Sequence, residues 1–418
     1  MNIAVVGSVD AGKTSCIGVL TKGIYDDGNG KARSMVSTHA HEVQSGRTSD
    51  IGFQRLFADP SDPQKDKNTS EYVHLIDLAG HEAYLRTTLR GLTNYYPSYA
   101  IVVINLNKGL TRITAEHISV CRGLHIPFII VFSKSDLAPS DVAEDTVKRA
   151  KEVCRAQGIK FFYETSEKEP EKLREILEVY DMNSSVVCPY IIISNKTGSG
   201  IGLLRSMLLR LPFRSPKQDP RLSLLTQFAQ EQQLTSVFLI YKPFWNRGIG
   251  WILHGLNVVG TLRKNDRLWL GPLGSSFHEM RVRSIHNEKR EEITELEPGV
   301  SGCIAFRLSD PNIEINRRQL CKGKVCLNQP FKVTKIRADI LVGNSEVTIT
   351  KGYRPYLHFS NASIGGVFIE SEKFPLRARD RASVVIQFDT PQFAYTGCRF
   401  LFREGKIRGI GLIREVIV

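Results

Sequence analysis

Eight residues near the start of the chain have the types and the spacing of a loop that binds phosphate. The run Gly7-Ser8-Val9-Asp10-Ala11-Gly12-Lys13-Thr14 fits the pattern G-x-x-x-x-G-K-[ST]. In such a loop the backbone N–H groups, here from Asp10 to Ser15, surround the phosphates. Lys13 would reach the β- and γ-phosphates, and the Thr14 hydroxyl would bind Mg²⁺. The pattern fixes only four positions, so a chance match is the alternative.

The elements on either side of the loop suit this role. The apolar run at residues 2–6 predicts a buried strand before the loop, and the apolar residues at 16–20 have helical spacing after it. A helix that begins at the end of the loop points its free N–H groups at a bound anion. Strand, loop and helix together favour a site for nucleotide phosphates.

Three further motifs follow apolar runs that are predicted as strands. Asp77-Leu78-Ala79-Gly80-His81 has the D-x-x-G form, in which the carboxylate holds the Mg²⁺ shell and the glycine N–H meets the γ-phosphate. Ser133-Lys134-Ser135-Asp136 is similar to the guanine-reading motif [NT]-K-x-D. Ser194-Asn195-Lys196 is similar to an S-A-K loop whose backbone contacts guanine O6.

The chemistry of the second of these motifs is specific for guanine. Guanine presents two parallel N–H donors that the Asp136 carboxylate can accept together, and adenine offers neither. The Lys134 stem would pack along the base. Ser133 departs from the usual Asn and keeps a hydroxyl, which predicts a lower affinity for the base. In isolation, a surface turn before a helix is the better explanation of these residues.

The order of the motifs is what makes chance a poor explanation. The carboxyl ends of parallel strands meet at one edge of a sheet, and each motif follows a predicted strand. The motifs therefore predict one site that binds guanine nucleotide phosphates at one end and the base at the other.

The polar stretch at residues 22–71 contains a further candidate and is predicted to be a long, mobile loop. Within Gly46-Arg47-Thr48-Ser49, the Thr48 hydroxyl would join Thr14 and Asp77 in holding Mg²⁺, while its backbone meets the γ-phosphate. Such a loop is ordered only while that phosphate is present. The alternative is a polar loop residue with no role in binding.

The elements needed to position these motifs form an α/β domain. Residues 1–215 alternate strand-like runs with helical segments, which predicts a P-loop domain with a mostly parallel sheet. A proline-rich stretch predicts a linker at residues 216–232, and the period-2 strands beyond it are typical of antiparallel β-barrels, assigned to 233–326 and 327–418. The expected strands of the first domain are 2–6, 73–78, 100–106, 128–132 and 190–194, and the expected helices include 141–157 and 170–180.

The positive charge of the chain is concentrated in its second half. The 418 residues carry a formal net charge of +13. Residues 1–215 hold 26 basic and 24 acidic residues, whereas residues 216–418 hold 30 basic and 19 acidic residues. Such a basic half is typical of a partner for a polyanion, most often nucleic acid, and a solvated basic surface is the alternative.

Composition also bears on where the protein works. No apolar run approaches the length of a membrane span, and the first motif lies within a few residues of Met1, so we expect a cytoplasmic protein without a signal peptide. The eight cysteines are scattered, which predicts reduced thiols that mostly pack in cores.

In these motifs the chain resembles the EF-Tu-like translational GTPases and, among them, the GTP-binding protein 1/2 family. GSVDAGKT is similar to that superfamily's G-x-V-D-x-G-K-T loop. The segments that point to the narrower family are HEVQSGRTSDIGF (41–53), DLAGHEAYLRTTLRGL (77–92), GTLRKNDRLWLGP (260–272), VRSIHNEKR (282–290) and LFREGKIRGIG (401–411).

The resemblance implies a GTP-binding domain followed by two β-barrels, and hydrolysis of GTP to GDP and phosphate with Mg²⁺. It implies that Lys13, Thr48 and His81 are catalytic residues and that His81 orients the attacking water. Asp10 matches a position that can also bind a monovalent cation, K⁺ or Na⁺. The residue before the loop threonine is usually Ile in this superfamily and is Arg47 here. We therefore expect an altered basal rate of hydrolysis.

The resemblance further implies partners for the barrels. It predicts a monomer whose barrels contact tRNA and the ribosome, in elongation or in ribosome rescue. Phe244 and Trp245 could stack on a nucleotide, although barrel packing is the expected role for at least one of them. Two alternatives are an RNA-binding adaptor with little intrinsic hydrolysis and a GTPase whose barrels bind protein partners such as the RNA-decay machinery.

Overall fold

The chain divides into two compact units. The structure is a computed structural model that describes residues 1–37, 42, 48, 50–58, 71–167, 169, 171–213, 218–320, 323–343, 348–404 and 406–418. The first unit comprises Met1–Leu92 and Tyr96–Phe213, and the second comprises Thr93–Tyr95 and Arg214–Val418.

The first unit is built on a seven-stranded sheet with the order β2-β3-β1-β4-β5-β7-β6. Its strands are β1 (Asn2–Gly7), β2 (Gly52–Phe57), β3 (Tyr72–Asp77), β4 (Tyr99–Asn105), β5 (Phe128–Ser133), β6 (Phe161–Thr165) and β7 (Val187–Ile192). Only β2 runs antiparallel to its neighbour, so the predicted mostly parallel sheet is confirmed. The central strands β4 and β5 are buried along their whole length, as expected for a sheet covered on both faces.

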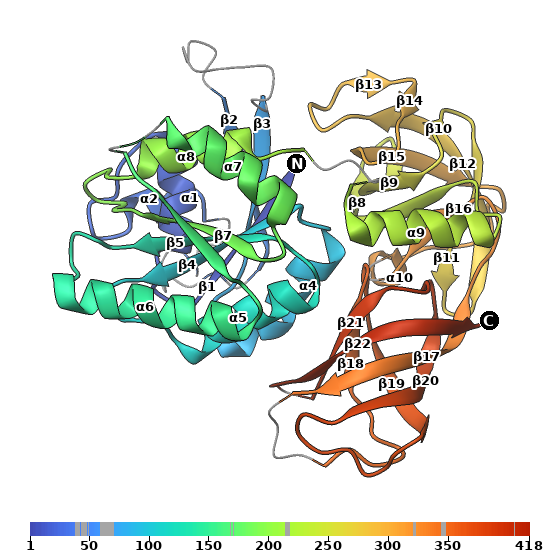
Figure 1. Ribbon diagram of the computed structural model, residues 1–418. Helices are drawn as coiled ribbons and strands as arrows, with labels where there is room; N and C mark the ends of the chain where they lie inside the picture. Colours follow the sequence, from blue (N-terminus) through green and yellow to red (C-terminus); the bar gives the residue numbers. More distant parts are fainter. Residues whose placement is uncertain are drawn as a thin grey trace. The chain divides into compact units, whose positions relative to one another are not determined.

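Helices cover both faces of this sheet. In Figure 1, α1, α7 and α8 lie above the sheet, and α4, α5 and α6 lie below it. The helices are α1 (Lys13–Lys22), α2 (Lys31–Ser34), α4 (Leu85–Asn94), α5 (Arg112–Gly123), α6 (Ser140–Ala156), α7 (Lys172–Asn183) and α8 (Ile201–Arg210). One core packs α1, α7 and α8 against strand residues such as Ile3, Val5 and Val103.

Part of the segment predicted to be a long loop is ordered. Within residues 22–71, α2 forms at Lys31–Ser34 and β2 forms at Gly52–Phe57, so the prediction of an unbroken loop is wrong there. The edge strand β2 buries only Leu56, and among the described residues its outer side has no neighbouring strand. It therefore lacks the apolar run that would have revealed it.

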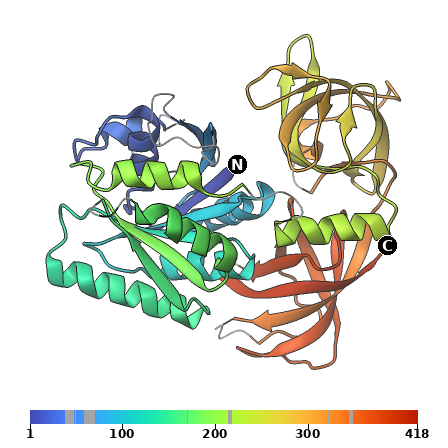
Figure 2. The same cartoon turned by 45° about the horizontal axis from the view of Figure 1, so that its top comes forward.

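The second unit contains two six-stranded antiparallel β-barrels, which Figure 2 shows with the yellow barrel nearly end-on. The first barrel closes in the order β11-β16-β8-β9-β15-β12, because β12 also pairs with β11. Its strands are β8 (Val237–Asn246), β9 (Gly250–Val259), β11 (Arg267–Leu273), β12 (Ser276–His286), β15 (Ser301–Leu308) and β16 (Val325–Leu327). Shorter elements beside it are β10 (Leu262–Arg263), β13 (Glu292–Ile293), β14 (Glu295–Leu296) and α10 (Arg317–Leu320).

The second barrel closes in the order β17-β20-β19-β18-β21-β22. Its strands are β17 (Val333–Val342), β18 (Tyr356–Phe359), β19 (Ala362–Ser371), β20 (Arg381–Gln392), β21 (Arg399–Glu404) and β22 (Lys406–Ile417). Along β17 the alternate residues Ile336, Ala338 and Ile340 are buried, as the period-2 pattern predicts.

Helix α9 (Pro220–Glu231) occupies most of the segment expected to be a linker. The Asp219 side chain caps it by accepting the N–H of Arg221 at 2.9 Å, and Pro220 suits the first turn. Leu225 and Phe228 lie on its buried face. The division of the barrels at residues 326 and 327 stays a prediction.

Two side chains at the end of β8 do not follow the sequence prediction. Phe244 and Trp245 are 39% and 63% exposed, so the expectation that at least one packs inside the barrel is wrong. The register of β8 against β9 shifts between Ile240 and Lys242, and the residues beyond that shift are mostly exposed. Trp245 instead packs edge-on against Trp251, with ring centroids 5.3 Å apart.

The cysteines agree with the prediction. Of the seven in the described part of the chain, all are free, and six are buried. No helix in the described ranges is long and apolar enough to cross a membrane.

Candidate functional site

The predicted phosphate loop joins β1 to α1 at the carboxyl end of the sheet. Lys13 is only 7% exposed, and its Nζ donates to the backbone oxygen of Ser8 at 2.9 Å. Burial lowers the pKa of Lys13, while the negative charges of Asp77 and Asp10 oppose that shift. A buried ammonium group whose hydrogen bond within the described residues goes to a backbone oxygen is well suited to receive an anion.

A cavity of about 570 Å³ opens over this loop, within the first unit. Its walls come from the phosphate loop, from residues 26–33 and from the motifs after β3, β5 and β7. The predicted site residues that line it are Val9, Asp10, Gly12, Lys13, Thr14, Ser15, Thr48, Gly80, His81, Lys134, Asp136, Asn195 and Lys196. The other predicted site residues, Gly7, Ser8, Ala11, Asp77, Ser133 and Ser194, are buried and do not line it.

Gly80 lies so close to the phosphate loop that no side chain would fit. A Cβ atom at this position would clash with Lys13 Nζ and would be 2.5 Å from the backbone oxygen of Gly7. The motif after β3 therefore touches the lysine that would bind phosphate. This contact explains why glycine is needed at the fourth position of D-x-x-G.

Three oxygen-bearing side chains converge beside Lys13. Thr14 Oγ1 donates to Asp77 Oδ2 at 2.6 Å, and the hydroxyls of Thr14 and Thr48 are 3.0 Å apart. The other carboxylate oxygen of Asp77, Oδ1, is buried and has no hydrogen-bond partner among the described residues. Burial raises the pKa of Asp77, whereas Lys13 and Thr14 oppose that shift. A carboxylate and two hydroxyls are the ligands that Mg²⁺ prefers, and the unpartnered oxygen fits such an ion.

The opposite end of the cavity carries the predicted base-reading residues. Ser194 Oγ donates to Asp136 Oδ1 at 2.6 Å, which fixes the orientation of the carboxylate. The same Ser194 oxygen accepts the N–H groups of Lys196 and Thr197 at 3.2 and 3.1 Å. The loops after β5 and β7 are thus joined at the residue expected to meet guanine.

The base end and the phosphate end are also joined to each other. Ser133 Oγ is buried and donates to the backbone oxygen of Ala11 at 2.6 Å. Asn195 Nδ2 donates to the backbone oxygen of Gly12 at 3.3 Å. The hydroxyl of Ser133 therefore supports the phosphate loop.

His81 begins a short 3₁₀ helix, η1 (Glu82–Tyr84), at the rim of the cavity. Its Nδ1 accepts the N–H of Ala83 at 3.1 Å, so the side chain caps the helix. Its ring packs edge-on against Tyr84 with centroids 6.0 Å apart.

Sequence reasoning missed the segment that forms one wall of the cavity. Asp26, Asp27, Gly28, Asn29, Gly30 and Arg33 line it. The N–H of Asp26 donates to the backbone oxygen of Asn195 at 2.8 Å, which ties this segment to the base end. Arg33 Nε is buried and finds no hydrogen-bond partner in the part of the chain that the structure describes. No motif marks these residues, and only their position between the first two motifs could have suggested them.

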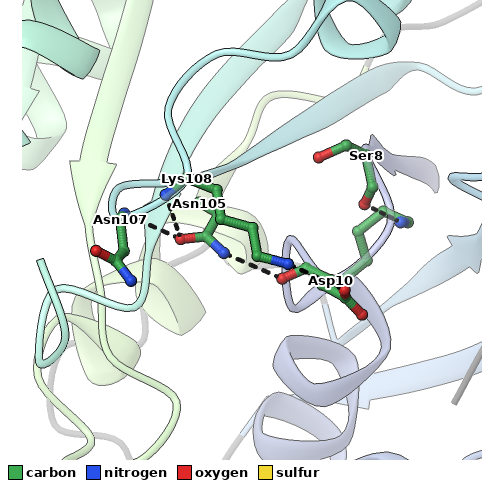
Figure 3. Close-up of polar contacts among 6 residues, drawn as sticks. Ser8, Asp10, Asn105, Asn107 and Lys108 are labelled. Carbon is green, nitrogen blue, oxygen red and sulfur yellow. Dashed lines mark hydrogen bonds and ion pairs between the residues drawn. The ribbon is translucent and has the colours of Figure 1, made fainter.

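Asp10 has a partner that sequence reasoning also missed. Lys108 Nζ lies 3.1 Å from Asp10 Oδ2, and Figure 3 shows this ion pair together with Asn105. Arg47, with the neighbouring Gly46 and Ser49, lies outside the described residues.

Comparison with known proteins places this geometry in a family. The model of the elongation factor Tu GTP-binding domain matches residues 1–213, which is the part of the chain that forms the cavity. The chain belongs to the EF-Tu family of translational GTPases. Its predicted resemblance to this family is therefore confirmed.

Relatives extend the match of this EF-Tu family member to both barrels. The chain is 30% identical over 438 residues to GTP-binding protein 1 of Xenopus laevis, covering 100% of this chain and 63% of that protein. It is 30% identical over 435 residues to GTP-binding protein 2 of Homo sapiens, covering 100% of this chain and 69% of that protein. The chain thus spans less than two thirds of the first of these relatives.

A solved structure shares the fold. The translation elongation factor SelB from Methanococcus maripaludis, in complex with the GTP analogue GppNHp, superimposes with a TM-score of 0.67 at 19% identity. The match covers 100% of this chain and 79% of that one.

Proposed function

We propose that the chain binds GTP, hydrolyses it to GDP and phosphate, and uses the two nucleotide states as a switch in translation. The observation that carries the proposal is the cavity, which joins a buried lysine on a phosphate loop to a carboxylate positioned by Ser194. The family provides the context, since its matching domain binds GTP.

The phosphate end supplies the groups that phosphoryl transfer requires. Transfer needs positioning and stabilisation of negative charge more than it needs covalent chemistry. Lys13 and the loop N–H groups from Asp10 to Ser15 would bind the phosphate oxygens. Thr14 and Thr48 would hold Mg²⁺, with Asp77 acting through water. The bound ion would neutralise charge that develops on the phosphates.

His81 would orient the water that attacks the γ-phosphate. In the structure its Nδ1 accepts the N–H of Ala83 as a helix cap, which suits a resting state in which this nitrogen is not yet used to orient the attacking water. A partner that reorients the ring would then set the rate of hydrolysis.

The resemblance also implies a monovalent cation at Asp10. The Asp10 carboxylate is already paired with Lys108, so no step of the reaction is assigned to such an ion.

We propose tRNA and the ribosome as the partners, for a monomer acting in the cytoplasm. The excess of 30 basic over 19 acidic residues in positions 216–418 supports binding to RNA phosphates. The barrels, with the division proposed near residue 326, would provide that surface.

Measuring GTP hydrolysis with and without ribosomes tests the proposal, with aminoacyl-tRNA or deacylated tRNA added in turn. We expect a slow rate for the protein alone and a rise of at least about 100-fold in one of the ribosomal mixtures, as expected when a partner completes the catalytic site. Binding of GTP without hydrolysis in every mixture would favour the RNA-binding adaptor instead.

A histidine substitution separates binding from turnover. His81→Ala should leave the Kd for GTP within about twofold, because His81 begins a helix at the rim and is not tied to the phosphate loop. The stimulated rate should fall by at least about 100-fold, in the range of a lost general-base or orienting group. Equal stimulated turnover in the variant would contradict the role proposed for His81.

A further inference from the structure

The carboxylate of Asp10 forms an ion pair with a lysine from outside the phosphate loop. Lys108 Nζ is 3.1 Å from Asp10 Oδ2, although the two residues are 98 positions apart in the sequence. Lys108 follows the end of β4, and Figure 3 shows its side chain extending from that turn to Asp10.

One buried side chain holds both backbones of this pair in place. Asn105, at the end of β4, is 3% exposed, and its Nδ2 donates to the backbone oxygen of Asp10 at 3.3 Å. Its Oδ1 accepts the N–H groups of Asn107 at 3.0 Å and Lys108 at 3.2 Å. The loop that carries Asp10 and the turn that carries Lys108 are therefore both hydrogen-bonded to Asn105 (Figure 3). This arrangement goes beyond a chance meeting of two flexible surface side chains.

The position of Asp10 creates a need for a positive charge. Asp10 lines the cavity on the loop that would surround the phosphates, and it has a left-handed backbone with φ 61°. At this position the negative charge of the carboxylate would be repelled by the phosphates of a bound nucleoside diphosphate or triphosphate. Lys13 attracts the Asp10 charge, but its Nζ donates to the backbone oxygen of Ser8, and Lys108 is the cation that forms an ion pair with the Asp10 carboxylate at 3.1 Å.

We propose that the ammonium group of Lys108 is the resident cation of Asp10 and takes the place of a potassium or sodium ion beside the bound phosphates. The inference rests on the proposed binding of guanine nucleotides. It predicts that nucleotide affinity does not depend on which monovalent salt is present.

The expected effect is moderate because the pair is partly exposed. The side chains of Lys108 and Asp10 are 57% and 54% exposed, so water screens their interaction. Loss of the ammonium should therefore weaken nucleotide binding by about threefold to fivefold when no small cation can replace it.

The test measures GDP binding by calorimetry in potassium chloride, sodium chloride and choline chloride at matched ionic strength, with Mg²⁺ constant. Wild type should give the same Kd in all three salts. Lys108→Met, which keeps an aliphatic stem and removes the charge, should bind GDP about threefold to fivefold more weakly in choline chloride. Potassium should restore its affinity, because the small ion can reach the vacated carboxylate and choline is too large.

Three further variants control the result. Lys148→Met removes the same charge from an exposed position on α6 and should behave as wild type in all three salts. Lys108→Arg keeps the charge and should also be insensitive to the salt. In an Asp10→Asn background there is no carboxylate to neutralise, so the additional cost of Lys108→Met should vanish. Asn tolerates the left-handed backbone of position 10.

Each other outcome overturns the inference. A wild-type affinity that improves when potassium replaces choline would show that Lys108 is not the cation. Unchanged affinity of Lys108→Met in choline chloride would show that Asp10 needs none. Equal weakening of Lys108→Met in all three salts would show that the lysine has another role. If the wild type bound GDP in none of the three salts, the proposed function itself would be overturned.

Discussion

Asp136 is the residue on which discrimination between bases depends. Its carboxylate is held by Ser194 at one oxygen, so its orientation is set before a base arrives. We predict that Asp136→Asn weakens GTP binding by about 100-fold, the loss of two charge-assisted hydrogen bonds of about 1.5 kcal/mol each. The NH₂ group of Asn would face the N2 amino group of guanine, where two donors repel each other. In xanthine it would face an acceptor oxygen. Affinity for xanthosine triphosphate should therefore rise.

Competition of both nucleotides against a fluorescent GDP measures this change. Asp141→Asn, at an exposed position in the first turn of α6, is the matched control and should keep the wild-type preference. A variant at position 136 that keeps its preference for GTP would contradict the role of Asp136 as the guanine reader.

His117, on α5, gives the first unit a dependence on pH. It is 1% exposed, and burial, with a smaller effect of the Lys13 charge, lowers its pKa from 6.5 to about 3. The unfolded chain therefore takes up a proton below about pH 6.5 that the folded chain excludes, so stability is full above this value and falls as the pH decreases. At pH 5 the loss should be about 2 kcal/mol.

Urea unfolding at about pH 7 and about pH 5 measures this loss. His117→Gln cannot take up the proton, so its stability should decrease less between the two pH values. The same decrease in the variant and the wild type would assign the pH dependence to other groups.

Site residues that are close together in the sequence can be predicted from it, whereas contacts between distant residues cannot. The phosphate loop is recognisable because eight consecutive residues between a strand and a helix carry all its groups. The hydroxyl of Ser133 bonds to Ala11, which is 122 positions away, and this contact depends on the sheet order. The same is true of Lys108 and Asp10. Such pairings become visible only once the topology is known.

Among the elements, the segment before α2 is the unexpected part of the site. Asp26 Oδ1 accepts the N–H of Ala32 at 3.1 Å, and Asp27 Oδ1 accepts the N–H groups of Asn29 and Lys31 at 2.8 and 3.2 Å. The bonds from Asn29 and Lys31 lower the pKa of Asp27. They also give this short segment a fixed shape that presents Arg33 to the cavity.

We predict that Arg33→Ala weakens nucleotide binding. Arg33 lines the cavity and its Nε has no hydrogen-bond partner within the described ranges, so we expect a phosphate or ribose oxygen of the nucleotide to be its acceptor. The expected loss is about tenfold, equivalent to one charge-assisted hydrogen bond.

Release of a fluorescent GDP measures the effect of Arg33→Ala, which should accelerate dissociation. Lys31→Ala removes an exposed positive charge two positions away that does not line the cavity, and it should release GDP at the wild-type rate. Equal rates for Arg33→Ala and wild type would mean that Arg33 does not contact the nucleotide.

The elements that sequence patterns missed are short or lie at the edges. Strands β4 and β5 are central and fully buried, so their apolar runs are continuous and easy to recognise. Strands β2 and β6 lie at the two ends of the sheet and alternate irregularly between exposed and buried residues. Helix α2 has four residues, too few to show a helical period.

For the whole molecule, the uneven charge makes the type of partner testable. Positions 216–418 hold 30 basic and 19 acidic residues, and this half contains both barrels. If the barrels bind tRNA, neutralised phosphates release counterions and the affinity falls steeply as salt increases. Contact with about five phosphates would give a slope of about −4 in a plot of log affinity against log salt.

Binding of labelled tRNA over a range of potassium chloride concentrations, with GTP bound, measures this slope. Binding of GDP over the same range separates any effect of salt on the nucleotide site. A nearly flat slope, or no binding of tRNA, would favour protein partners for the barrels.

The bonds from Ser133 to Ala11 and from Asn195 to Gly12 also bear on fidelity in a cell, where other nucleoside triphosphates compete for the same phosphate loop. A competitor with adenine would leave the Asp136 carboxylate without its donors and would disturb the loops that carry Ser133 and Asn195. Ser133 and Asn195 support the loop that surrounds the phosphates. The wrong base would therefore also weaken binding of the triphosphate, which all competing nucleotides have in common. Guanine nucleotides would therefore be selected by one network of hydrogen bonds that joins the base site to the phosphate loop, without a separate proofreading step.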